Sequence, residues 1–227
     1  MAAEPIATED TTSWRELAVT RSLDPARARA EERVQRFIDA ALDLMSDSGT
    51  NDFTVQQVVD RSGQSLRSFY QYFEGKHELL LALFEESIAR VARHLAHVID
   101  GSDDPLERLR IFTIEYYRIC APARRGKKAK GDGLDPRALA EFAQQLLIEH
   151  PREAAQAYAP LVDLLEALLG EATAAGAIRD DLETRRVAGV LLQAIMFNTF
   201  SATISGSSVH DGAEALLDIV FHGLVEH

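Results

Sequence analysis

Apolar residues recur at intervals of three and four along almost the whole chain, and no run alternates as a half-buried β-strand would. This period predicts amphipathic helices, so the expected fold class is all-α. The first clear helix covers residues 33–48, and a second covers 54–62 with Gly63 as its end. Ser65, a favourable N-cap residue, then predicts a short third helix over 65–73.

The remaining pattern predicts longer helices. Glycine, proline and lysine interrupt it at 121–136, which is expected to be a loop. Proline also disfavours a helical conformation for the residue before it, so His150-Pro151 is expected to break a helix. The periodic segments lie at about 76–99, 104–120, 136–149, 161–169, 182–203 and 213–225.

The short segment 65–73 has two chemically different arcs on a helical wheel. The apolar arc, with Tyr70 at its edge, comprises Leu66, Phe69 and Phe73. The opposite arc carries hydrogen-bonding side chains of different reach, namely Arg67, Ser68, Gln71 and Tyr72. Such a face suits the major groove of DNA, and helix 54–62 before it would complete a helix–turn–helix. An ordinary corner of a helical bundle explains the same spacing, so both interpretations stand at this point.

Composition narrows the class of protein. Of the 227 residues, 46% are hydrophobic and 26% charged, which is typical of a globular protein. The net charge of −12 argues against a protein that coats nucleic acid non-specifically, because that affinity comes from summed lysine and arginine. With one cysteine, no signal peptide and no apolar run of about 18 residues, the expectation is a cytoplasmic protein that does not enter the membrane.

Catalytic and metal-binding patterns are weak. His94 and His97, with Asp100 one turn on, have a spacing compatible with a metal, but a solvated helix face is the favoured interpretation. The run at 207–211 holds serine, histidine and aspartate in a row, whereas a catalytic triad is assembled in space. We therefore expect no enzyme, no catalytic residues, no metal site and no cofactor.

Residues 37–84 resemble the N-terminal domain of TetR-family transcriptional regulators. The resemblance rests on A-x-x-L-x-x-x-x-G in the first helix, T-V-x-x-V, the turn glycine Gly63, and S-x-x-S-F-Y-x-x-F-x-x-K followed by two leucines. Carried over to this sequence, the DNA-contacting positions of the family are Thr54, Gln56, Leu66, Arg67, Ser68, Tyr70, Tyr72 and Lys76. Among them, Tyr70 and Lys76 would hold phosphates, and Arg67, Ser68 and Tyr72 would face bases.

The resemblance implies a function and a division of the chain. It implies a helix–turn–helix DNA-binding domain (33–80) and a ligand-binding and dimerisation domain (81–227), and the residues before them are expected to be a flexible or short-helix N-terminal arm (1–32). The implied activity is repression from a palindromic double-stranded operator, with release by a small hydrophobic or amphipathic effector. The homodimer would form through about 182–203 and 213–225. The alternative is a helical small-molecule binding protein without operator function.

Two further predictions concern the effector and the basic segments. Apolar side chains mixed with a few polar ones suit a pocket for such an effector, and they are Phe112, Thr113, Tyr116, Tyr117, Phe142 and Leu146. Most of these would be core residues on any interpretation. Arginines of the arm 1–32 could follow DNA into the minor groove, although disorder explains the arm equally well. The basic segment 124–130 is expected to be a solvated loop.

Overall fold

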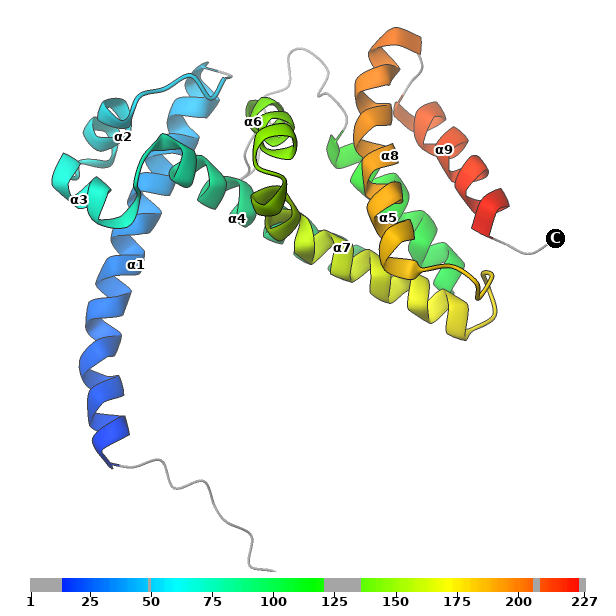
Figure 1. The fold of residues 1–227 in the computed structure, drawn as a ribbon, viewed down its shortest axis with the longest axis horizontal. Coiled ribbons are helices and arrows are strands. Elements are labelled where there is room, and N and C mark those ends of the chain that lie inside the picture. Colours follow the sequence, from blue (N-terminus) through cyan, green and yellow to red (C-terminus); the bar gives the residue numbers. More distant parts are fainter. Residues whose placement is uncertain (1–13, 49, 121–135, 206–208, 225–227) are drawn as a thin grey trace, which may run out of the picture.

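The computed structural model describes residues 14–48, 50–120, 136–205 and 209–224. Within these ranges every regular element is an α-helix, which confirms the expected fold class (Figure 1). In chain order the helices are α1 (Trp14–Ser48), α2 (Val55–Ser62), α3 (Leu66–Tyr72), α4 (Lys76–Ile99), α5 (Pro105–Cys120), α6 (Pro136–Glu149), α7 (Pro151–Ala174), α8 (Thr184–Ser205) and α9 (Val209–Leu224).

We call residues 33–80 the head, in which the end of α1, then α2, α3 and the first turn of α4 surround an aromatic core. Phe37 and Phe69 are fully buried there, and their rings meet edge to face with centroids 5.3 Å apart. Phe73 is also buried and lies edge-on to Phe37 at 6.2 Å. These contacts fix the short α3 against the end of α1, since a helix of 7 residues has little stability of its own.

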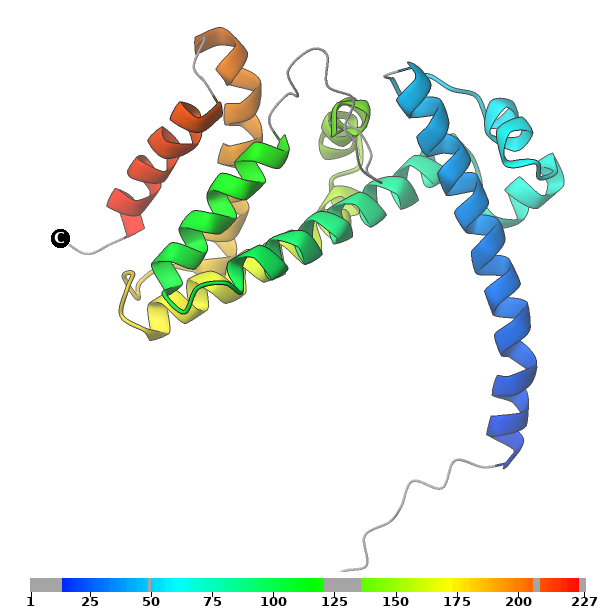
Figure 2. The same ribbon diagram turned by 180° about the vertical axis from the view of Figure 1, so that it is seen from behind.

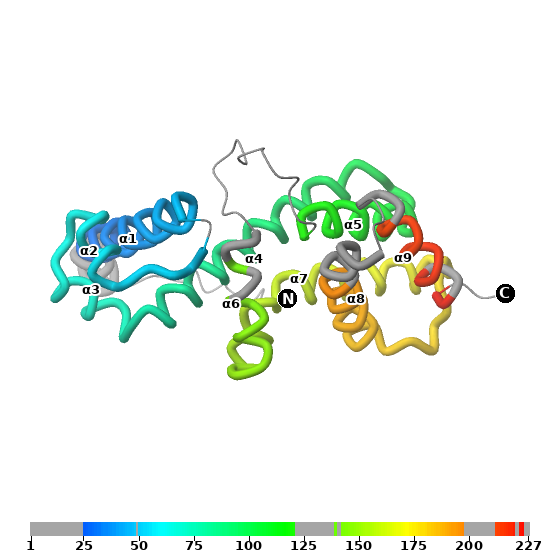
Figure 3. The backbone as a smooth tube through the Cα atoms, turned by 90° about the horizontal axis from the view of Figure 1, so that it is seen from above, coloured from blue at the N-terminus to red at the C-terminus, as the bar shows by residue number. Residues whose placement is uncertain are grey.

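We call residues 81–227 the body, and α4 joins it to the head. α4 packs along α7, while α5 lies against α4, α7, α8 and α9. From behind, α4 is seen running out of the head along the length of the body (Figure 2). From above, the molecule is elongated, with α2 and α3 at one end and α8 and α9 towards the other (Figure 3).

The first helix is longer than the apolar period predicts, because it begins at Trp14 and not near residue 33. Its added part projects away from the head (Figures 1 and 2). Residues 26–33 are alanine, arginine and glutamate, all good helix formers, and they are mostly exposed. Pairs at i, i+4 join Arg27 to Glu31 at 2.8 Å and Glu32 to Arg36 at 2.7 Å. A segment that is polar all round, such as residues 26–33, gives no hydrophobic period, so the apolar pattern does not reveal it.

Candidate nucleic-acid interface

Local hydrogen bonds fix the geometry of α2 and of the turn that follows it. The Gln57 backbone N–H donates to the Thr54 hydroxyl at 3.2 Å, and the Thr54 N–H donates to the Gln57 side chain at 2.7 Å. This reciprocal pair is the capping box that the sequence predicts. At the other end, Gly63 has a φ of 64°, a left-handed conformation that costs glycine little. The turn to α3 therefore has one defined geometry.

The start and end of α3 are equally well defined. The Ser65 hydroxyl accepts a hydrogen bond from the Ser68 N–H at 3.1 Å, as expected of an N-cap. The helix ends at Tyr72, because Phe73 has an extended backbone with φ −135° and ψ 131°. α3 is thus two turns of helix held at the tip of the head.

The exposed face of α3 differs from the face drawn on the wheel. Leu66 and Tyr70, assigned to the apolar arc and its edge, are 42% and 57% exposed. Tyr72, assigned to the outer arc, packs against the core instead. The Ser68 hydroxyl is buried and has no hydrogen-bond partner among the residues the structure describes. The exposed side chains are Leu66, Arg67, Tyr70 and Gln71.

The difference has a simple cause in the position of the helix end. A wheel that includes Phe73 as a helical residue, at about 100° per residue, centres the apolar arc between Phe69 and Phe73. Phe73 reaches the core from an extended backbone, so its direction does not define the helix face. When Phe73 is not counted on the wheel, the centre of the buried face lies closer to Ser68 and Tyr72. Leu66 moves to the solvent side.

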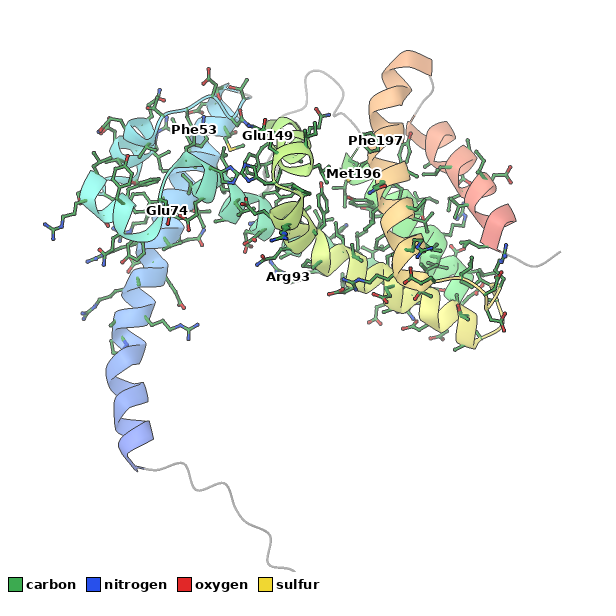
Figure 4. The ribbon with its side chains drawn as sticks, viewed as in Figure 1. Phe53, Glu74, Arg93, Glu149, Met196 and Phe197 are labelled. Atoms are coloured by element: carbon green, nitrogen blue, oxygen red, sulfur yellow. The ribbon has the colours of Figure 1, made fainter. Side chains whose placement is uncertain are left out.

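The neighbouring predicted positions on α2 and α4 are also at the surface. Thr54 and Gln56 are exposed, with the Gln56 amide donating to Asp60 at 2.8 Å. The Lys76 ammonium lies 4.8 Å from the centre of the Phe53 ring, a cation–π contact that positions it at the start of α4. Figure 4 labels Phe53 in the head.

Positive charge in the head is sparse. Arg61 is directed back to α1, where it pairs with Asp47 at 3.1 Å. Arg67, by contrast, is exposed on α3 and has no ion pair among the described residues. A phosphate or a base acceptor near α3 would therefore meet the charges of Arg67 and Lys76.

The predicted effector-binding residues all lie in the core of the body. They are 0–5% exposed, and the Thr113 hydroxyl donates within its own helix to the Leu109 carbonyl at 2.9 Å. Polar groups do meet there, since the Tyr116 hydroxyl and the Cys120 thiol form a hydrogen bond. Burial raises the pKa of Tyr116 well above its usual value and the pKa of Cys120 to about 11. Both groups are therefore neutral near pH 7.

The outer faces of α8 and α9 carry apolar side chains without cover in one protomer. Val190 and Phe197 are 59% and 63% exposed, and Ala194 lies between them on the same face of α8. Ile219 on α9 is 72% exposed. Figure 4 labels Phe197 and Met196 on α8. Other apolar residues of the two segments predicted to form the dimer are buried inside the protomer, namely Leu191, Ile195, Leu216, Leu217 and Leu224.

Among the described residues, His94 and His97 do not belong to a group of three potential metal ligands. His94 instead pairs with Glu115 at 3.1 Å. Sequence reasoning missed a different group, in which His77, His150 and Glu153 come together from α4 and from the corner between α6 and α7. No spacing rule could find it, because 76 residues separate His77 from Glu153. The basic segment 124–130 and the run 207–211 lie wholly or partly outside the described residues.

Comparison with known proteins identifies the family. Residues 37–83 match the model for bacterial regulatory proteins of the tetR family, and residues 129–226 match the C-terminal domain of SbtR-like transcriptional regulators. The chain belongs to the TetR family. This is a family of DNA-binding transcriptional regulators, which confirms the resemblance and the expectation that the chain is a regulator and not an enzyme.

Relatives with known descriptions agree with this assignment. The fatty acid metabolism regulator protein of Bacillus subtilis is 20% identical over 179 residues, 79% of this chain and 85% of that protein. The regulator BetI of Brucella canis is 32% identical over 77 residues, which cover 34% of this chain and 39% of BetI.

Solved structures show the same fold. FadR of Bacillus subtilis, solved with stearoyl-CoA, is 17% identical with a TM-score of 0.63, over 83% of this chain and 98% of FadR. A protein of unknown function from Rhodococcus sp. RHA1 is 18% identical with a TM-score of 0.66, over 86% of this chain and 96% of that protein. Within the described ranges, no helix of this TetR-family chain is long and apolar enough to cross a membrane.

Proposed function

We propose that this regulator is a cytoplasmic homodimer that represses transcription from a palindromic operator until a small hydrophobic or amphipathic ligand releases it. Residues 33–80 would read DNA, residues 81–227 would bind the ligand and form the dimer, and residues 1–32 would be an arm. The observation that carries the proposal is the exposed face of α3, because a capped helix held at the tip of the head can enter a major groove.

The exposed face assigns roles to individual side chains. Arg67 and Gln71 are suited to base edges, since guanidinium and amide groups match guanine and adenine respectively. Leu66 would pack on a thymine methyl group, and Tyr70 would reach phosphate with its hydroxyl. Thr54, Gln56 and Lys76, exposed or partly exposed around α3, would hold the backbone of the DNA. Ser68 and Tyr72 are assigned no DNA contact, because the Ser68 hydroxyl is buried and Tyr72 packs against the core.

The uncovered faces of α8 and α9 support dimerisation. Val190, Phe197 and Ile219 would be buried if two copies packed these helices together as a four-helix interface. A symmetric dimer places two copies of α3 on one face of DNA, with half-sites about 34–36 Å apart. The operator should therefore be an inverted repeat.

The core between α5 and α7 supports an apolar effector. Buried aromatic rings surround a few neutral polar groups there, including Tyr116, Cys120 and Tyr158. A ligand with a long apolar part and one polar anchor fits that chemistry. The relative solved with stearoyl-CoA makes long-chain acyl thioesters the first class to test.

Selection of bound duplexes from a random DNA pool tests the proposal. The expected result is enrichment of an inverted repeat whose half-site centres lie about one helical turn apart. Failure to enrich any sequence, together with ligand-dependent stabilisation of the protein, would favour a helical small-molecule binding protein without operator function.

A further inference from the structure

Three metal-ligating side chains converge where the head meets the body. His77 lies in the first turn of α4, while His150 and Glu153 lie at the corner between α6 and α7. One potential ligand atom from each residue lies within 4.8 Å of the other two. Figure 1 shows this corner beside the part of α4 that leaves the head.

The backbone holds these residues in place. His150 ends one helix and begins the next, because its N–H donates to the Leu146 carbonyl at 2.9 Å and its carbonyl accepts from the Ala154 N–H at 3.0 Å. Glu153 follows one turn later on α7. The His77 ring packs against His150, with centroids 4.5 Å apart, and against Phe142 at 5.7 Å. The arrangement is therefore formed before any ligand binds.

Among the described residues, Glu153 pairs with two histidines and with no arginine or lysine. One carboxylate oxygen of Glu153 lies 2.7 Å from His77 Nε2, and the other lies 3.3 Å from His150 Nδ1. The His94–Glu115 pair is different, because Arg118 also pairs with Glu115, at 2.7 Å.

We propose that His77, His150 and Glu153 bind a divalent first-row transition-metal ion of the Zn²⁺ type. Two imidazoles and a carboxylate are a ligand set that suits Zn²⁺ and does not suit Mg²⁺ or Ca²⁺. Tetrahedral bonds of about 2.0–2.1 Å place ligand atoms roughly 3.3 Å apart. The three potential ligand atoms lie within 4.8 Å of one another, so rotation of the exposed side chains has to bring them to that spacing. All three side chains are 38–45% exposed, which leaves a path for the ion and a position for water.

A metal at this position would tie the head to the body. His77 follows Lys76, the residue to which we assign a phosphate contact, on the helix that links both parts. An ion that pins the first turn of α4 to the α6–α7 corner restricts how the two parts can move relative to each other. The metal-bound protein then differs from the metal-free protein in operator affinity if the two arrangements bind the operator differently. In that case operator binding changes the affinity for the metal by the same factor. This second step depends on the proposed function, whereas metal binding itself does not.

Zn²⁺ titration of the full chain, freed of metal with a chelator, tests the site. A chromophoric chelator that competes for Zn²⁺ reports affinity, and equilibrium dialysis reports stoichiometry. We expect one tightly held ion per protomer. His150→Gln and Glu153→Gln should each lower the affinity at least about tenfold, while the matched control His94→Gln should not. Co²⁺ in place of Zn²⁺ should give visible absorption bands of tetrahedral intensity, which both site variants lose.

Thermal unfolding separates binding from misfolding. Both variants should melt cooperatively without metal, and Zn²⁺ should raise the melting temperature of the wild-type chain and of His94→Gln only. Zn²⁺ affinity in folded His150→Gln and Glu153→Gln equal to that of the wild-type chain would overturn the site.

The coupling between metal and operator is tested separately, by operator affinity with and without Zn²⁺. A change of several-fold in the wild-type chain that is absent in His150→Gln supports the coupling, and an unchanged affinity in metal-loaded protein overturns it.

Discussion

Ser68 is the residue of α3 whose side chain is least suited to its surroundings. Its hydroxyl is buried without a partner among the described residues, and such a group costs about 1–3 kcal/mol. Ser68→Ala should therefore leave the free energy of unfolding unchanged or raise it by up to about 1 kcal/mol, because alanine also favours the helix. Urea denaturation checks this value.

The matched control for Ser68 is the cap residue three positions earlier. Ser65→Ala removes the hydroxyl that accepts from the Ser68 N–H, and should cost about 1 kcal/mol. The burial argument is wrong if Ser68→Ala destabilises the protein as much as Ser65→Ala, or if it changes the ranking of operator variants.

Arg67 and Lys76 should affect DNA binding in different ways. Arg67 is exposed on α3, so Arg67→Ala should cost about 1–3 kcal/mol and relax specificity at one position of each half-site. Lys76→Ala should weaken binding to all sequences alike and flatten the salt dependence. Competition between operator variants measures both effects. An unchanged ranking with Arg67→Ala would show that this side chain does not read bases.

Cys120 should react slowly with thiol reagents despite being only partly buried. Burial raises its pKa from 9.0 to about 11, and the hydrogen bond from Tyr116 lowers the pKa by less. Since the thiolate is the reactive form, the rate of disulfide exchange with an aromatic disulfide should rise about tenfold per pH unit between pH 7 and pH 10. A rate that levels off below pH 9 would contradict this environment.

At the scale of elements, α8 and α9 are expected to hold the dimer together. Phe197→Glu places a charge on the exposed apolar face of α8 and should give a monomer at micromolar concentration by light scattering. Ile148→Glu is the matched control, because Ile148 is 81% exposed but lies on α6. A wild-type monomer, or dissociation caused by Ile148→Glu as well, would remove the proposed interface.

The helices differ in how well the sequence predicts them. Capping residues and the glycine at position 63 predict α2 and the start of α3 because they act through local hydrogen bonds. Residues 26–33 of α1 have no apolar period, so helix propensity and i, i+4 pairs are what indicates a helix there. The sequence predicts the outer face of α3 only in part. Phe73 lies one residue beyond the end of the helix, and counting it on a helical wheel shifts the apparent centre of the buried face.

At the scale of the whole molecule, the fold and the family follow from patterns in the sequence, but contacts between distant residues do not. The group formed by His77, His150 and Glu153 depends on how α4 packs against the α6–α7 corner. Likewise, the sequence of α8 is apolar on most sides, so it does not distinguish buried from exposed positions. The packing of α5, α7 and α9 against it decides which face stays open.

Effector binding should act through the body and reach the head through α4. A long-chain acyl thioester or a similar lipophilic compound should raise the melting temperature and weaken operator binding. Thr113→Trp should alter both responses without changing the DNA-reading face, because Thr113 lies on α5, in the core of the body. Overpacking that core should also cost about 1–3 kcal/mol of stability. If a broad panel of lipophilic compounds changes neither property, the effector class is wrong.

Equilibrium binding to a selected duplex is the most direct test of the central claim, that α3 makes this chain a sequence-specific regulator. Fluorescence anisotropy at physiological salt would compare the selected inverted repeat with a scrambled duplex of equal length and composition. The account predicts at least about a thousandfold preference for the selected duplex, and two protomers bound per repeat. Equal affinity for both duplexes would contradict it.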